Sequence, residues 1–272
     1  MAHARLCIVS DIHCGPETPT KKGNRALELL RPFVDYARIM QPDVLLDLGD
    51  RITDVDTPTD RRNLVEVAAR LGAVRCERIH LLGNHDVGRM SRTENAEILG
   101  VPMKSRVVPL DGCRIVVWQP HVRVEATGLP PAASTLDWLR TALAASDLPA
   151  IVVSHVPVSG QSLLGNYYFG RGSNIATYPD HAEVRRVAEE SGKVALWLSG
   201  HVHWNSLTIV NGIPHVTIQS LTETFTTPPE PSGAYAELEI AGGMFELTVH
   251  GRDPFHLRLP FRPSGERRWL GK

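Results

Sequence analysis

Apolar and polar residues along the chain form two alternating kinds of segment. Short, nearly continuous apolar runs are typical of buried strands, and they are followed by segments in which apolar residues recur every three or four positions, as in amphipathic helices. In the first part of the chain, this pattern predicts strands at 6–9, 44–48 and 79–82 and helices at 26–37 and 64–71. Such strand–helix alternation indicates an α/β core with parallel strands.

The remainder of the chain turns from mixed to almost purely β. Further strands are predicted at 107–108, 114–118, 150–153 and 194–198, and helices at 134–145, with Ser134 as the N-cap, and 182–190. Three dipeptides that favour two-residue hairpin turns lie between apolar runs: Asp111-Gly112, Asn211-Gly212 and Gly242-Gly243. No linker interrupts the pattern, so we expect one domain over 1–272 with a β-rich C-terminal part at 204–262.

The composition narrows the class of protein. With 29 basic and 30 acidic residues and 42% hydrophobic residues, the chain resembles an ordinary globular domain rather than a disordered one. The absence of a basic excess makes a nucleic acid polymer an unlikely partner by charge. No apolar run has the roughly 20 residues that cross a bilayer, and the first residues lack a secretory pattern, so we expect no membrane association and a cytoplasmic location.

Polar residues follow five of the predicted strands directly. The five motifs are Ser10-Asp11-Ile12-His13, Gly49-Asp50, Gly83-Asn84-His85-Asp86, Ser154-His155 and Gly200-His201-Val202-His203. Ligands bind outside the carboxyl ends of strands in open α/β sheets, so these side chains are expected to converge on one site. If the backbone stays extended, residues two apart point the same way, and the glycines leave room for close approach.

The donor types in these motifs indicate metal ions. Carboxylate and amide oxygens combined with imidazole nitrogens favour Mn, Fe or Zn. Two divalent ions would bring four positive charges, and the two aspartates at Asp11 and Asp50 cancel only half of that charge. The remaining positive field would attract a phosphate group, although the chain as a whole is nearly neutral.

In this order, the motifs resemble those of the calcineurin-like metallophosphoesterase superfamily, and their spacing is similar to the branch that includes class III cyclic-nucleotide phosphodiesterases and glycerophosphodiesterases. The resemblance implies an α/β (α+β) fold, a four-layer αββα sandwich of two mixed sheets flanked by helices. It also implies two divalent or trivalent metal ions. The residues that it assigns are Asp11, His13 and His203 for one ion, Asn84, His155 and His201 for the other, and Asp50 as the bridge.

The implied activity is hydrolysis of a small organic or cyclic-nucleotide phosphodiester by a metal-activated hydroxide. His85 would be the catalytic residue that protonates the leaving alkoxide or holds the phosphate. Its carboxylate partner is left open between Asp54, four positions after Asp50, and Asp86. The alternatives are a phosphomonoesterase or phosphoprotein phosphatase, and a non-catalytic scaffold with the same fold.

Substrate contacts are expected from the loop at 159–180 and from Arg51. Tyr167 and Tyr168 are candidates to stack on the substrate and Arg171 to contact its phosphate, or the loop aromatics pack the loop onto the domain or a second subunit. Arg51 is either a phosphate contact or a solvated or ion-paired side chain. The β-rich tail offers a surface for a homo-oligomer.

Overall fold

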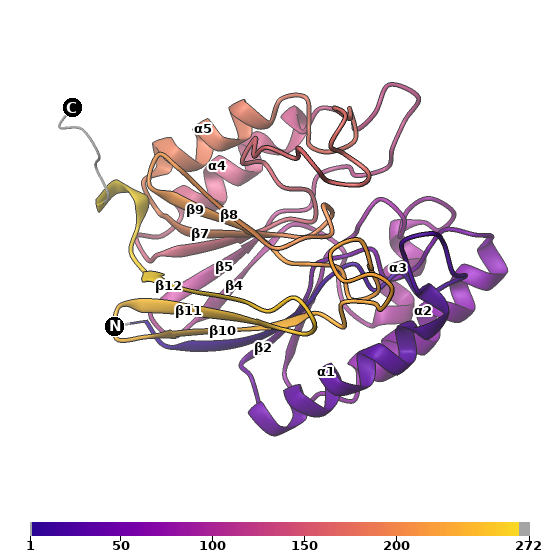
Figure 1. Cartoon of the computed structure of the whole chain (residues 1–272). Helices are drawn as coiled ribbons and strands as arrows, with labels where there is room; N and C mark the ends of the chain where they lie inside the picture. Colours follow the sequence, from indigo (N-terminus) through magenta and orange to yellow (C-terminus); the bar gives the residue numbers. More distant parts are fainter. Residues whose placement is uncertain (1, 267–272) are drawn as a thin grey trace.

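The computed structural model describes residues 2–266, and two mixed β-sheets form its centre (Figure 1). They stack face to face, with helices on both outer faces, so the predicted αββα arrangement is confirmed. The strands of the first sheet, in spatial order, are β12 (Phe255–Pro260), β11 (Met244–His250), β10 (Tyr235–Ala241), β1 (Ala4–Val9), β2 (Val44–Asp47) and β3 (Glu77–His80). Strands β1 to β3 are parallel, and the C-terminal strands add to β1 in antiparallel fashion.

The second sheet has a parallel centre with antiparallel edges. Its strands, in spatial order, are β4 (Arg106–Leu110), β5 (Cys113–Val117), β6 (Ala150–Val153), β7 (Val194–Ser199), β9 (Ile213–Thr217) and β8 (Ser206–Val210). The three dipeptides predicted to turn hairpins connect β4 to β5, β8 to β9 and β10 to β11. The glycines at 112, 212, 242 and 243 all adopt positive φ, which these turns require.

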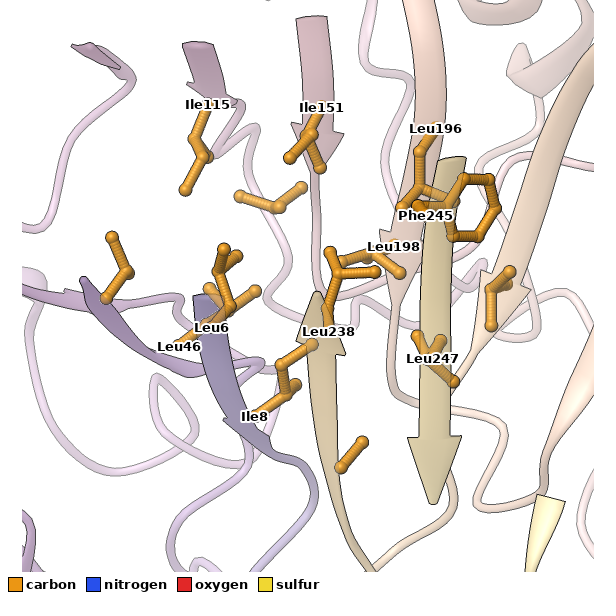
Figure 2. Close-up of a cluster of buried hydrophobic side chains, with 14 of the residues drawn as sticks. Leu6, Ile8, Leu46, Ile115, Ile151, Leu196, Leu198, Leu238, Phe245 and Leu247 are labelled. Carbon is orange, nitrogen blue, oxygen red and sulfur yellow. The ribbon is translucent and has the colours of Figure 1, made fainter. Parts of the chain in front are cut away.

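Side chains from the two sheets interleave in one shared apolar core. Figure 2 shows Leu6 and Ile8 of β1 pointing into this layer, toward Ile115 and Ile151 of the opposite sheet. Cys7, which alternates with them along β1, faces the other way, into a second cluster beneath the helices. A core that spans both sheets supports the expected single domain, which stays a prediction.

The helices cover the outer faces of the sheets. α1 (Ala26–Met40) and α2 (Thr57–Leu71) lie against the first sheet, and α4 (Leu136–Ala144) and α5 (His181–Ser191) against the second (Figure 1). Among the described residues, no helix combines the length and apolar character that crossing a bilayer requires.

Two details of the helices differ from the sequence prediction. α3 (Arg92–Leu99) was not predicted, because it buries only Asn95 and Leu99 and therefore has no apolar stripe. Its start is instead defined by a capping box of Ser91 and Glu94. Ser134 is not an N-cap: it lies inside a short 3₁₀ turn that precedes α4.

Candidate metal centre

Two groups of buried metal-binding side chains lie where the central strands of both sheets end. One group consists of Asp11, His13, Asp50 and His203, and the other of Asp50, His155 and His201. Within each group, the candidate ligand atoms all lie within 4.8 Å of one another. Asp50 belongs to both groups, which is the arrangement expected of a carboxylate that bridges two ions.

The backbone at these residues is left-handed rather than extended. The φ angles are 50° at Asp11, 46° at His13, 54° at Asp50, 69° at His201 and 60° at His203. The expectation that residues two apart share a face through an extended chain is therefore wrong, because tight turns bring the ligands together. Each non-glycine residue in this region costs about 1–2 kcal/mol, and such strain is concentrated at functional sites.

The glycines of the motifs let the backbone approach the ligand side chains closely, as predicted. A Cβ atom on Gly83 would overlap the carboxylate of Asp50, and one on Gly200 would overlap the side chain of Ser10. A Cβ on Gly49, which has φ +102°, would lie 2.8 Å from Nδ1 of His155. Substituting any of these glycines would push a ligand or its support out of place.

The two ligand groups contain four imidazoles, and hydrogen bonds hold three of them in position. Nδ1 of His155 lies 2.8 Å from the carbonyl oxygen of Leu48, and Nδ1 of His203 lies 2.9 Å from Oε2 of Glu223. Nε2 of His201 lies 2.6 Å from the carbonyl oxygen of Ile175. An imidazole that donates from one nitrogen presents the lone pair of the other, as metal-bound histidines do.

The site also contains buried polar atoms without partners, which are rare in folded proteins. They include Oδ1 of Asp11, Nδ1 of His13, Oδ1 of Asn84 and Nε2 of His155. Asn84 sits between Gly83 and His85, and the backbone N–H of His85 donates to Oδ1 of Asp50 at 2.8 Å. These unsatisfied atoms and the donor set fit two metal ions.

The charges of the site favour an ionised bridge. Burial opposes ionisation of Asp50, but His155 and His85 outweigh it and hold its pKa well below the usual range. Burial likewise opposes protonation of His155, but Asp50 and Asp11 raise its pKa to about 9. Burial and then the charge of Lys21 hold the pKa of His13 well below its usual value. A metal ion binding here would therefore displace a proton from His155.

His85 lies beside these ligands and is paired with Asp54. Its Nδ1 lies 2.9 Å from Oδ1 of Asp54, and its ring meets the ring of His13 edge-on at 4.9 Å. The side chain of His85 is 28% exposed, so its other nitrogen is accessible to a substrate. The alternative partner, Asp86, does not contact the ring of His85.

Asp86 instead pairs with Arg51, so the ion-paired alternative for Arg51 is observed and the phosphate contact is not. The guanidinium of Arg51 is fully buried, with Nη1 2.7 Å from Oδ2 of Asp47 and Nη2 2.8 Å from Oδ2 of Asp86. Asp86 also accepts backbone N–H groups from Asp50, Arg51 and Gly83, each at 2.9 Å. This buried network holds the turn that carries the bridging carboxylate.

Three residues that the structure places around the site were not predicted from the sequence, namely Asp47, Glu223 and Lys21. Glu223 is fully buried and holds His203. It follows β9, which runs parallel to β7, so the rule that polar residues follow parallel strands would have found it if β9 had been assigned as parallel.

The loop at 159–180 rests directly on the ligand histidines. Nδ2 of Asn166 donates to the carbonyl oxygen of Val202 at 2.8 Å, the ring of Phe169 lies 5.1 Å from that of His201, and the ring of Tyr168 lies 5.4 Å from that of His203. Tyr167 is 60% exposed. Arg171 is also exposed. Packing of the loop aromatics onto the domain is thus observed for Phe169 and Tyr168, and substrate contacts of the loop stay a prediction.

Two stacked mixed sheets with a pair of metal-binding clusters at their strand ends define the class of dimetal phosphoesterases. The family model of the calcineurin-like phosphoesterases matches residues 4–205, and the chain belongs to this family. No curated protein matches the chain.

Solved structures show the same fold at low sequence identity. A dimetal phosphatase from Danio rerio is 19% identical, with 96% of this chain and 100% of that chain covered and a TM-score of 0.77. The purple acid phosphatase PPD1 from yellow lupin is 13% identical, with 94% and 53% covered and a TM-score of 0.66. GAP50, described as the anchor in the inner membrane complex of Plasmodium, is 14% identical, with 96% and 90% covered and a TM-score of 0.61.

Proposed function

We propose that this metal-dependent phosphoester hydrolase acts on a small organic phosphodiester and uses Mn, Fe or Zn. The observation that carries the proposal is the position of Asp50, whose carboxylate is shared by the two ligand groups. Asp11, His13 and His203 would hold one ion with it, and Asn84, His155 and His201 the other. When bound, the two ions lower the pKa of a water molecule and polarise the phosphoryl oxygens.

His85 would donate a proton to the leaving oxygen of the substrate. Asp54 holds Nδ1 of His85, which orients the ring and leaves Nε2 free for the substrate. The ring of His13 packs against it and restricts its position. A proton supplied by this route stabilises the alkoxide that forms when the phosphoester bond breaks.

The loop at 159–180 supports a small substrate rather than a folded phosphoprotein. Tyr168 and Phe169 pack on ligand histidines, so the loop covers one side of the centre. Tyr168 is placed to contact the organic group of a substrate, and the exposed Tyr167 and Arg171 would meet its outer part. The spacing of the motifs, similar to that of phosphodiesterases, supports a diester.

The proposal is tested with chelated and reconstituted protein. We expect chelation to abolish hydrolysis of bis(p-nitrophenyl) phosphate and Mn to restore it, with two ions bound per chain by elemental analysis. Asp50→Asn should lower turnover to background and reduce the bound metal, whereas Asp137→Asn, on a surface carboxylate that is 97% exposed, should change neither.

Three results would contradict the proposal. Full activity without metal would exclude the mechanism. Faster cleavage of p-nitrophenyl phosphate than of the diester would replace the diesterase by a phosphomonoesterase, and hydrolysis of neither ester by the metal-loaded protein would favour a non-catalytic scaffold.

A further inference from the structure

A buried lysine borders the metal centre. Lys21 is only 7% exposed, although lysine side chains are rarely buried. Its backbone pairs with that of Glu223, and hydrogen bonds on both sides secure the pairing: Lys22 N–H donates to Thr222 at 2.9 Å, and Thr224 N–H donates to Thr20 at 2.7 Å. The segment that carries Lys21 is therefore tied to the segment that positions His203.

The ammonium group of Lys21 has no carboxylate partner among residues 2–266, because no carboxylate oxygen of this part of the chain lies within 4.0 Å of it. Glu223 is engaged with His203 and with the N–H of Thr224. The ammonium lies instead over the ring of Tyr168, 5.6 Å from its centroid. A cation–π contact compensates only part of the cost of burying a charge.

The adjacent Lys22 provides a contrast within the same turn. It is more exposed than Lys21, and its ammonium pairs with Glu17. Two neighbouring lysines thus differ in that Lys22 pairs with a carboxylate and Lys21, which lies over Tyr168, has no carboxylate partner among residues 2–266.

Lys21 lies at one end of a row of aromatic rings across the site. The ring of His85 contacts that of His13 at 4.9 Å, His13 contacts His203 at 4.8 Å, and His203 contacts Tyr168 at 5.4 Å. Lys21 covers the Tyr168 end, and the protonating residue His85 is at the other end. A substituent on phosphorus that points toward Tyr168 would therefore reach the ammonium group of Lys21.

Bound metal ions would increase the positive charge near Lys21 and strengthen its attraction for an anion. Two divalent ions bring four positive charges next to two ligand carboxylates, Asp11 and Asp50, and Lys21 adds a further positive charge.

We propose that Lys21 determines specificity by binding a second anionic group of the substrate, a carboxylate or phosphate on the substituent that remains on phosphorus. The substrate class is then a phosphoester with an additional negative charge beyond the scissile phosphoryl group. This inference rests on the proposed function, since it places the scissile group at the metal centre.

The test compares two non-hydrolysable ligands of nearly equal shape, 3-phosphonopropionate and its carboxamide, by calorimetric titration of Mn-loaded protein. We expect the carboxylate to bind about tenfold more tightly than the amide, because one charge-assisted contact is added. Lys21→Met should remove the preference and Lys21→Arg should keep it. Lys22→Met, which removes the neighbouring charge, should leave it unchanged.

The outcomes separate this inference from the proposed function. Equal affinity of the two ligands for the wild type, or an unchanged preference in Lys21→Met, would overturn it. An equal loss of affinity for both ligands in Lys21→Met would also overturn the inference, since Lys21 would then bind the phosphonate. Failure of both ligands to bind Mn-loaded wild type would contradict the proposed function itself. The melting temperature of metal-free Lys21→Met should equal that of the wild type, because the ammonium group forms no ion pair within residues 2–266 that the substitution would break.

Discussion

Two histidine–aspartate pairs connect the same two strand ends and yet differ in their environment. Nδ1 of His80 lies 2.8 Å from Oδ2 of Asp47, and Nδ1 of His85 lies 2.9 Å from Oδ1 of Asp54. The pair of His80 and Asp47, the inner pair, is fully buried. In the outer pair, the side chains of His85 and Asp54 are 28% and 36% exposed. Equal chemistry and equal distances therefore do not give equal roles, because burial decides which pair a substrate can reach.

The surroundings of the two pairs explain why their roles differ. Asp47 also holds the buried guanidinium of Arg51, which reaches Asp86 and the turn of Asp50. Burial lowers the pKa of His80, although Asp47 opposes this effect, so the inner imidazole favours its neutral form. The inner pair is thus part of the support of the bridging aspartate, and the outer pair is the one to which our proposal assigns proton transfer.

The largest expected effect separates the outer pair from the inner one. His85→Asn should lower the turnover number by about 10²–10⁴-fold, the usual contribution of a general acid. Its free energy of unfolding should change by less than about 0.5 kcal/mol, because the side chain is partly exposed. Steady-state kinetics and urea unfolding of the same preparation measure both. His80→Asn is the matched control and should show mainly a loss of stability; the opposite pattern would invert our comparison.

Removal of the Arg51 guanidinium, which pairs with Asp47 of the inner pair, should cause the largest loss of stability. Arg51→Met leaves Asp47 and Asp86 buried without their partner, so the free energy of unfolding should fall by about 3–5 kcal/mol. Urea unfolding of metal-free protein measures this change. Arg140→Met, which removes a surface guanidinium that pairs with Asp137, should change it by less than about 1 kcal/mol. Wild-type stability of Arg51→Met would show that the buried network does not support the fold.

The inner aspartate should also make stability depend on pH. Burial opposes ionisation of Asp47, but Arg51 and His80 outweigh it and lower its pKa from 3.8 to about 2. The folded state therefore binds this proton less readily than the unfolded state, and the contribution of about 2 kcal/mol is present above about pH 4 and lost as the pH falls through about 2. We expect the stability difference between wild type and Asp47→Asn to shrink over this range. A difference that is constant between pH 6 and pH 2 would contradict the assigned role.

The smallest effect is expected at the outer carboxylate. Asp54→Asn should lower turnover by about tenfold, because His85 loses its orienting partner but keeps its place beside His13. Stability should remain within about 0.5 kcal/mol of wild type. In the double variant with His85→Asn, the Asp54 substitution should have no further effect on turnover. Additive losses would show that Asp54 does not act through His85.

The sequence predicted the centre of this fold well. Regular alternation of apolar residues is a local property, so the parallel strands β1, β2, β3, β6 and β7 and the three hairpins were located from the pattern alone. A short helix and the start of another were harder to predict from the sequence. α3 depends on a capping box rather than on an apolar stripe, and α2 begins at Thr57, where Asp56 caps a polar first turn.

The candidate ligands were named from the sequence by type and order, and their convergence followed from the direction of the parallel strands. The partner of His85 was not determined, since the sequence does not show whether the imidazole pairs with the adjacent Asp86 or with Asp54, which is 31 positions away. The role of Arg51 was left open between a phosphate contact and a solvated or ion-paired side chain, because nothing local shows that a residue beside a ligand is buried between Asp47 and Asp86.

The sequence by itself thus determined most of the strands, the family and the chemical types of the ligands, because these depend on short-range pattern and order. The tertiary structure decided which His–Asp pair is partly exposed, which arginine supports the fold and which of two adjacent lysines has no carboxylate partner among residues 2–266. Burial and the choice of partner arise from segments far apart in the chain, as when residues near 21 pair with those near 223 beside the histidines.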